Sequence, residues 1–176
     1  MENWYLVSLV GKDRSGLVAK VSAALCKAGC NLGDSSMARL GGNFTILLMV
    51  QTKGTADQLQ EIILPLCQTL ELSPQIKTVP GGLEHHVQPD VRISVYAKDR
   101  LGIVEDVTTA LANAGLNILS LDSNSGQDQK SQSPTYYIHI EGTVSQGVDP
   151  LYEALKILSS EKNMDTQLIP INPEMN

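Results

Sequence analysis

Two hydrophobic periods alternate along the chain in a fixed order. Apolar side chains occupy every second position over residues 91–97, and residues 5–9 show the same alternation, which is typical of a strand with one buried face. Apolar side chains then recur at spacings of three and four over residues 17–28 and 103–114, which predicts an amphipathic helix in each place. Each helix is expected to end at an Ala-Gly pair, because glycine readily adopts the left-handed conformation that closes helices.

Two strands and a second helix are predicted to follow the first helix. The strands cover residues 32–40 and 44–52, which flank a Gly-Gly-Asn turn suited to a tight hairpin. Thr55 and Gln58 have the spacing of a capping box that opens the second helix. Pro65 is expected to kink or shorten that helix, because proline lacks the amide proton that a helix interior uses.

The second half of the chain shows the same series with one difference. Strands are predicted over residues 117–123 and 135–142, but residues 124–134 are expected to form a polar, mobile loop in place of a tight turn. Asp149 and Pro150 provide a cap and a first-turn proline for the second helix. The last strands of the two halves are expected over residues 76–79 and 167–171.

The two halves also repeat each other residue by residue. The segment KDRSGLV at residues 12–18 returns 86 positions later as KDRLGIV at residues 98–104. Over residues 12–32, 11 of 21 positions are identical to their counterparts, without a gap. Such agreement indicates two copies of one structural unit.

The order strand-helix-strand-strand-helix-strand, present twice, defines the predicted fold. We expect an α+β protein of two ferredoxin-like βαββαβ units, each a four-stranded antiparallel sheet with two helices on one face. The units are assigned to residues 1–80 and 91–176, with residues 81–90 as the linker. Residues 44–50 are apolar on both sides of the third strand, so we expect a sister unit or another chain to cover it, which favours a homo-oligomer.

Composition and charge narrow the class of protein. The chain has 176 residues, 42% of them hydrophobic, which suffices for a core but leaves no room for a large catalytic domain. Residues 1–80 hold seven basic and six acidic side chains, and the remainder holds six and thirteen, for a net charge of -6. No basic run with interleaved aromatic residues exists, which argues against direct contact with nucleic acid. No segment has the character of a membrane helix or secretory signal, so we expect a cytoplasmic protein.

Residues able to carry covalent or metal chemistry are scarce. His85 and His86 lie in the predicted linker with no acid or nucleophile beside them, and His139 lies on the expected exposed side of a strand. Cys26 and Cys30 lack the nearby histidine pair that a zinc site would use. Nucleotide-binding, serine-hydrolase and zinc-protease motifs are absent. We therefore predict no catalytic residues, no metal site, no cofactor and no enzymatic activity.

The repeated loop between the first strand and the first helix is the best candidate for a ligand site. Free amides at a helix start favour an anion, and Gly16 and Gly102 would let a ligand approach the backbone closely. Asp13 and Asp99 either cap the helix or receive the ammonium group of a ligand. A carboxylate ligand fits this loop.

Two further pairs of repeated residues could contact the same ligand. Arg14 and Arg100 either bind a carboxylate or serve a solvated or interdomain role. Asn31 and Asn117, at the end of the first helix, either turn the chain or offer an amide to a ligand.

These residues are similar to those of a known family. The Lys-Asp-Arg-x-Gly-Leu/Ile-Val loop, the Ala-Gly-x-Asn-Leu/Ile helix end and the element order resemble tandem ACT domains, which are small amino-acid-sensing modules. The resemblance implies that an amino acid binds at a domain interface, where this loop of one unit faces the start of the second strand of another. It nominates as ligand-binding residues Asp13, Arg14, Gly16, Leu17, Val18, Asn31, Leu32, Asp99, Arg100, Gly102, Ile103, Val104, Asn117 and Ile118. Ser15 and Leu101 depart from the pattern, because they stand where the family's loop often has proline.

The resemblance implies a regulatory protein. A small amino acid effector, such as glycine, would bridge two units and change the affinity for a protein partner, such as a transcription activator. Two other interpretations stay open, which are a regulatory module or subunit of an amino-acid or one-carbon metabolic enzyme, and an adaptor that binds no ligand. Acylphosphatase-like chemistry would need Arg14 and Asn31 as a phosphate-cradling pair.

Overall fold

The computed structural model describes residues 2–80, 87–128 and 132–171 of the chain. The chain divides into two compact units, Met1–His85 and His86–Asn176, which we call unit 1 and unit 2 and describe separately. Of the linker predicted over residues 81–90, residues 81–86 lie outside the described part.

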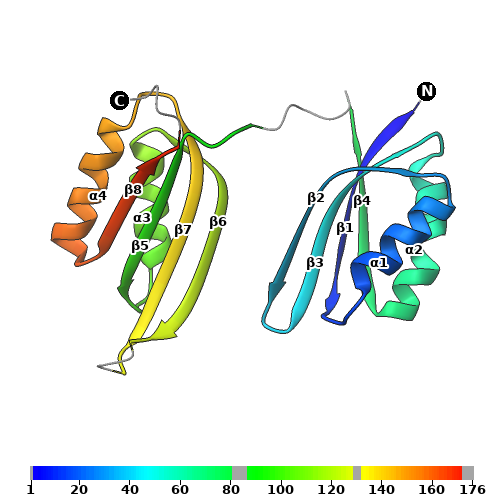
Figure 1. Ribbon diagram of the computed structural model, residues 1–176, viewed down its shortest axis with the longest axis horizontal. Helices are drawn as coiled ribbons and strands as arrows, with labels where there is room; N and C mark the ends of the chain where they lie inside the picture. The colour runs from blue at the N-terminus through cyan, green and yellow to red at the C-terminus, as the bar shows by residue number, and fades with distance from the viewer. Residues whose placement is uncertain (1, 81–86, 129–131, 172–176) are drawn as a thin grey trace. The chain divides into compact units, whose positions relative to one another are not determined.

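Unit 1 is a four-stranded antiparallel sheet with two helices on one side (Figure 1). The strand order is β2-β3-β1-β4, so the first strand in the chain lies between the third and the fourth. The elements are β1 (Asn3–Lys12), α1 (Leu17–Lys27), β2 (Asn31–Leu40), β3 (Asn43–Thr52), α2 (Ala56–Leu70) and β4 (Leu72–Val79).

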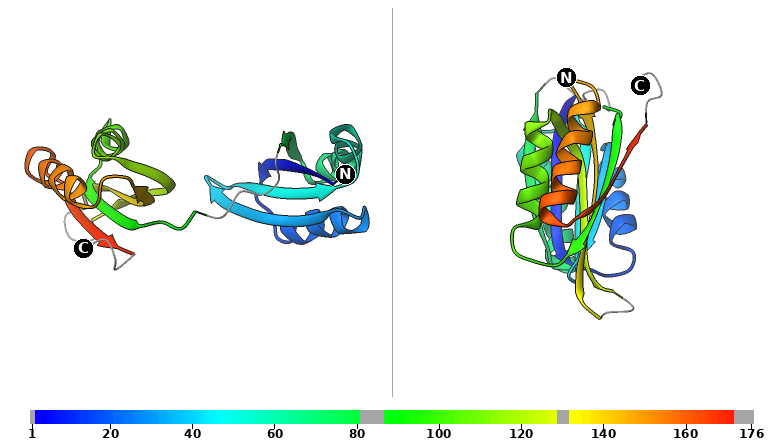
Figure 2. Two further views of the ribbon diagram at one scale, coloured as in Figure 1. Left: turned by 90° about the horizontal axis from the view of Figure 1, so that it is seen from above. Right: turned by 90° about the vertical axis from the view of Figure 1, so that its left-hand side faces the viewer.

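Unit 2 repeats this arrangement with the strand order β6-β7-β5-β8. Figure 2 shows the two helices of each unit on the same side of its own sheet. The elements are β5 (Val91–Lys98), α3 (Ile103–Asn113), β6 (Leu116–Gln127), β7 (Pro134–Val144), α4 (Asp149–Lys162) and β8 (Asp165–Pro170). The predicted fold of two βαββαβ units is confirmed.

Each unit has its own hydrophobic core between the sheet and the helices. In unit 1 the alternating side chains of β1 and β3 pack against the apolar stripe of α1, and Leu25 is fully buried. The equivalent Leu111 is fully buried in the core of unit 2. Burying a leucine side chain contributes about 1.5–3 kcal/mol, so these stripes fix the helices on the sheets.

The first helix of each unit ends at its Ala-Gly pair, as the sequence predicts. Gly29 has a φ of 75°, and its amide donates to the carbonyl oxygen of Cys26 over 3.0 Å. The next amide, that of Cys30, donates to the carbonyl oxygen of Leu25 over 3.0 Å, which completes a Schellman motif. Gly115 closes α3 with a φ of 88°.

The helix α2 begins at the predicted capping box and continues past Pro65. Thr55 and Gln58 form both hydrogen bonds of the capping box. Pro65 does not shorten the helix, because α2 continues to Leu70, whereas the alternative, a kink at Pro65, stays a prediction. Buried side chains on both sides of the proline hold the helix on the sheet and offset the missing amide hydrogen bond.

Two predictions for unit 2 are also corrected. Residues 124–127 belong to β6, because they pair in register with β7, whereas residues 129–131 of the predicted loop lie outside the described part. A bond of 2.9 Å between the hydroxyl groups of Ser123 and Tyr136 reinforces this pairing. Asp149 does not cap α4, because the N-cap residue is Val148 and Asp149 is the first residue of the helix.

The helix-free faces of the two sheets differ in chemistry. In unit 1 this face carries apolar side chains of β1 and β3, and Val10 and Leu47 are 47% and 43% exposed. In unit 2 the equivalent face is polar, with Arg92 donating to Glu141 across β5 and β7 over 2.7 Å. The strand β3 is apolar on both faces, as expected from the sequence. The helices cover one of these faces, and the side chains of the other face are partly exposed within unit 1.

Chemically reactive groups are sparse in the described ranges. Within them, no three His, Cys, Asp or Glu side chains are grouped so that they could hold a metal ion. Cys26 is exposed, whereas Cys30 and Cys67 are buried, and burial raises the pKa of the Cys67 thiol. Among the helices described above, none has both the length and the apolar surface needed to cross a membrane.

Candidate functional site

The loop between β1 and α1 has the same backbone geometry in both units. Gly16 is the N-cap residue of α1 with φ 82° and ψ 9°, and Gly102 is the N-cap residue of α3 with φ 84° and ψ 6°. No side chain caps either helix start. Open space lies where a Cβ atom would stand on each glycine, so a ligand can reach the backbone there. Only glycine adopts this left-handed conformation without strain, which explains its place in both copies.

The aspartates of the loop do not cap the helices, so that alternative is wrong. Asp13 lies three residues before the N-cap position, and its carboxylate pairs with Arg39 of β2 over 2.5 Å. Its amide donates to the carbonyl oxygen of Gly42 over 3.0 Å, which fixes the loop against the β2–β3 turn. The amide of Asp99 donates in the same way to Pro134, but Ser125 takes the register position of Arg39 in unit 2. The ion pair therefore belongs to unit 1.

The two arginines of the loop pair with carboxylates of their own units. Arg14 donates to Glu71, the C-cap residue of α2, over 2.5 Å. The guanidinium of Arg100 contacts Asp106 of α3 over 2.5 Å and the carbonyl oxygen of Leu101 over 3.1 Å. A ligand carboxylate would have to share either arginine with that partner. Arg14 and Glu71 are both substantially exposed, so their pairing is worth about 0–1 kcal/mol and is easily exchanged.

The start of α3 is more negative than the start of α1. The first turn of α3 carries Glu105 and Asp106, whereas the first turn of α1 carries no acidic residue. The hydrogen bond from Arg100 lowers the pKa of Asp106, with a smaller charge effect from Lys162 at 3.5 Å. The Asp106 carboxylate is thereby kept ionised close to the loop. The two loops therefore differ in the charged groups that surround them.

The apolar residues nominated beside the glycines play two different parts. Leu17 and Ile103 are 2% and 3% exposed and belong to the cores, so they offer a ligand only their backbone. Val18 and Val104 are 40% and 37% exposed on the outer side of the helices. They could contact the apolar portion of a ligand.

The other nominated residues lie at the opposite end of the first helix. Asn31 begins β2 after the 11 residues of α1, which at 1.5 Å per residue span about 16 Å. Its amide donates to Gln51 over 3.3 Å, and Asn117 donates to Thr143 over 3.5 Å. Leu32 and Ile118 follow them as half-buried residues. A single unit therefore does not bring its glycine loop and its asparagine together, which excludes an acylphosphatase-like pair of Arg14 and Asn31 within unit 1.

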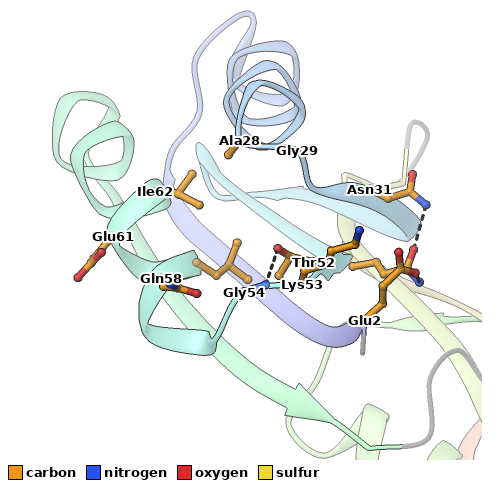
Figure 3. A pocket seen from close by; sticks show the side chains of 12 residues that line it. Glu2, Ala28, Gly29, Asn31, Thr52, Lys53, Gly54, Gln58, Glu61 and Ile62 are labelled. Carbon is orange, nitrogen blue, oxygen red and sulfur yellow. Dashed lines mark hydrogen bonds between the residues drawn. The ribbon is translucent and has the colours of Figure 1, made fainter.

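Asn31 also borders a hollow that sequence reasoning missed. This hollow, of about 710 Å³, lies between the end of α1 and the start of α2 (Figure 3). Its lining includes Gly29 and the β3–α2 connection. In the sequence, the only sign of this hollow is the short connection between β3 and α2. A short connection does not indicate a hollow unless the position of the end of α1 beside it is also known.

Comparison with protein families assigns the fold. An ACT-domain model matches residues 4–77, and another ACT-domain model matches residues 91–160. The chain is a tandem ACT-domain protein. The two matches fall within unit 1 and unit 2, so each βαββαβ unit is one ACT domain.

Known relatives extend over the whole tandem ACT-domain protein. The glycine cleavage system transcriptional repressor of Escherichia coli (strain K12) is 24% identical over 174 residues, covering 97% of this chain and 92% of the relative. The crystal structure of an unknown protein from Galdieria sulphuraria has a TM-score of 0.77 at 26% identity, covering 98% and 100% of the two chains. A crystal structure provisionally assigned as a glycine cleavage system transcriptional repressor has a TM-score of 0.69 at 25% identity, covering 98% and 99%.

These comparisons define the general role of the tandem ACT-domain protein. ACT domains are regulatory modules, and the curated relative that spans both of them is a repressor. The protein is therefore a regulator and not an enzyme.

Proposed function

We propose that this protein senses a small α-amino acid, with glycine as the first candidate, at the loops of Gly16 and Gly102. Occupancy of these loops would modulate a transcription activator by protein–protein contact, in control of the glycine cleavage system. The observation that carries the proposal is the repeated loop, whose glycine begins the first helix of each unit with the same backbone angles and no side-chain cap.

The loop suits the carboxylate of an amino acid. The amides of the first helical turn have no partner within the helix, and a carboxylate can accept from them with the favourable helix dipole. Val18 and Val104 border this position with exposed apolar surface, which suits a small aliphatic portion. A glycine ligand would leave that surface uncovered, and alanine or serine would cover part of it.

The ammonium group needs oxygen acceptors that the loop supplies only in part. Asp13 is already paired with Arg39, so the carboxylate of Asp99 and the side-chain oxygens of Asn31 and Asn117 are the remaining nominated acceptors. Asn31 lies about 16 Å from the loop of its own unit, so it does not complete the site at that loop. Ligand binding would change the affinity for the protein partner, and a coupling of about 1–3 kcal/mol between the two binding events is sufficient for regulation.

The proposal is tested by isothermal titration calorimetry of the full chain against the twenty amino acids. Gly16→Ala and Gly102→Ala place a methyl group where the ligand would approach. Gly147→Ala is the matched control, because Gly147 also has a positive φ, of 79°, and open space at its Cβ position but lies outside both loops.

We expect saturable binding that weakens about tenfold or more in the loop variants and stays unchanged in Gly147→Ala. The affinity of the unit 1 loop should exceed that of the unit 2 loop, because of the acidic first turn of α3. Absence of heat for every amino acid, or equal loss in all three variants, would overturn the sensor and leave an adaptor without a ligand.

A further inference from the structure

The hollow of unit 1 lies at the end of the unit opposite the Gly16 loop. Its walls come from the end of α1, from the β3–α2 connection, and from the face of α2 that carries Glu61 and Ile62 (Figure 3). Glu2, Asn31 and Lys53 lie on the side away from α2. The volume of about 710 Å³ is within the range of about 300–1,000 Å³ that small-molecule sites occupy.

Side chains occupy the space next to the equivalent glycine of unit 2. A Cβ atom on Gly115 would meet the side-chain oxygen of Ser145 at 3.5 Å and Gln146 at 3.6 Å. A Cβ atom on Gly29, at the equivalent position of unit 1, would meet nothing within 4 Å. The connection after β7 has four residues, 145–148, whereas the connection after β3 has three, 53–55. The shorter connection of unit 1 accompanies open space at Gly29, and the longer connection of unit 2 accompanies side chains at Gly115. Gly115 therefore serves as the internal control for binding in this hollow.

The floor of the hollow is held in place by buried and local hydrogen bonds. The hydroxyl group of Tyr5, a residue that is 4% exposed, donates to the carbonyl oxygen of Gly54 over 3.0 Å. The amide of Gly54 donates to the hydroxyl oxygen of Thr52 over 3.2 Å, and the capping box fixes the residues that follow. A site on this connection is therefore preorganised and loses little entropy on binding.

The rim carries both signs of charge. Lys53 is exposed and, among the described residues, forms no ion pair, and the same holds for Glu61. The carboxylate of Glu2 accepts from Gln51 over 2.8 Å, and Gln51 in turn accepts from Asn31 over 3.3 Å. A free ammonium group and a positioned carboxylate on one rim match a ligand that carries both charges. Ala28 and Ile62 provide a small apolar surface across the hollow from these two charged residues (Figure 3).

We infer that this hollow is a second ligand site, specific to unit 1, for a zwitterionic α-amino acid. The ligand's carboxylate is bound by Lys53 and its ammonium group by Glu2. The site uses one unit alone, so it does not depend on the Gly16 and Gly102 loops or on how ACT units assemble.

The test is a titration of the isotopically labelled full chain with the twenty amino acids, followed by the backbone amide signals of its glycines in NMR spectra. Gly29 and Gly54 report on the hollow, Gly16 and Gly102 on the loops, and Gly115 on the equivalent position in unit 2. Lys53→Ala removes the cation, and Ile62→Trp fills the space. Lys20→Ala and Ile157→Trp are the matched controls, at exposed positions on α1 and α4.

We expect Gly29 and Gly54 to shift together and saturably with at least one amino acid while Gly115 stays still. Affinity should fall about tenfold in Lys53→Ala and binding should vanish in Ile62→Trp, with both controls unchanged. The deaminated and decarboxylated analogues of that amino acid should each bind about tenfold more weakly. The inference is overturned if Gly29 and Gly54 stay still for every amino acid, if the two variants bind like their controls, or if either analogue binds as well. Shifts at Gly16 and Gly102 report separately on the proposed sensor function.

Discussion

Truncating one methyl group in the core of unit 1 should destabilise that unit alone. Ile46 of β3 and Ile138 of β7 occupy equivalent register positions, opposite Leu9 and Val95, and are 2% and 0% exposed. Among the described residues, the core around Ile46 contains residues of unit 1, and the core around Ile138 contains residues of unit 2. Ile46→Val and Ile138→Val therefore remove the same group from two separate cores.

The expected cost of Ile46→Val is about 1 kcal/mol of the free energy of unfolding, the middle of the range for this substitution. With a urea dependence of about 1 kcal/mol per molar for a domain of this size, the unfolding midpoint should fall by about 1 M. The single tryptophan of the chain, Trp4, lies in β1, so its fluorescence follows unit 1.

Urea unfolding of the full chain, followed by Trp4 fluorescence, checks this expectation. Ile46→Val should move the fluorescence midpoint by about 1 M, and Ile138→Val should leave it in place while shifting the circular dichroism change of unit 2. Equal movement of the fluorescence midpoint in both variants would refute the reasoning, because it would show one cooperative unfolding unit rather than two.

Three further substitutions test the local interactions. Thr55→Ala removes the capping box of α2 and should cost about 1 kcal/mol in the same fluorescence assay. Gly11→Ala should cost about 1–3 kcal/mol and lower the melting temperature, because its Cβ would lie 2.5 Å from the carbonyl oxygen of Glu71. Asp106 has a lowered pKa in the folded protein, so its contribution to stability is present above the ordinary pKa of about 3.9 and is lost as pH falls through the lowered value. Asp106→Asn should therefore make acid unfolding of unit 2, followed by circular dichroism, less steep below about pH 4.

The fold could be predicted because its determinants are local. Alternation of apolar residues gave the strands, a spacing of three and four gave the helices, and Gly29 and Gly115 gave the helix ends. The gapless repeat of residues 12–32 at residues 98–118 then linked the two halves without knowledge of any contact between elements. The sequence could not show that α2 continues past Pro65. The buried apolar side chains on both sides of the proline outweigh one missing hydrogen bond, and their burial depends on tertiary packing.

The candidate site was predictable only as far as its backbone. Gly16 and Gly102 follow from the loop pattern, but the partner of Arg14 is Glu71, which is 57 residues away in the chain. The sequence could not indicate that pairing, because it depends on where α2 ends. The capping role expected of Asp13 failed for a related reason, since the glycine three residues later begins the helix in a left-handed conformation.

Duplication has preserved the loop backbone and changed the charges around it. The angles of Gly16 and Gly102 agree within a few degrees, yet Arg14 pairs with a residue of α2 and Arg100 with a residue of α3. An Asp, Ser or Thr at the N-cap position would stabilise each helix by only about a few tenths of a kcal/mol relative to glycine, and a φ above 80° at that position favours glycine. Contact of a ligand with these two open helix starts stays a prediction, which the calorimetry tests. The acidic first turn of α3 distinguishes the proposed ligand site of unit 2 from that of unit 1, so we expect the two sites to differ in their affinity for an anion.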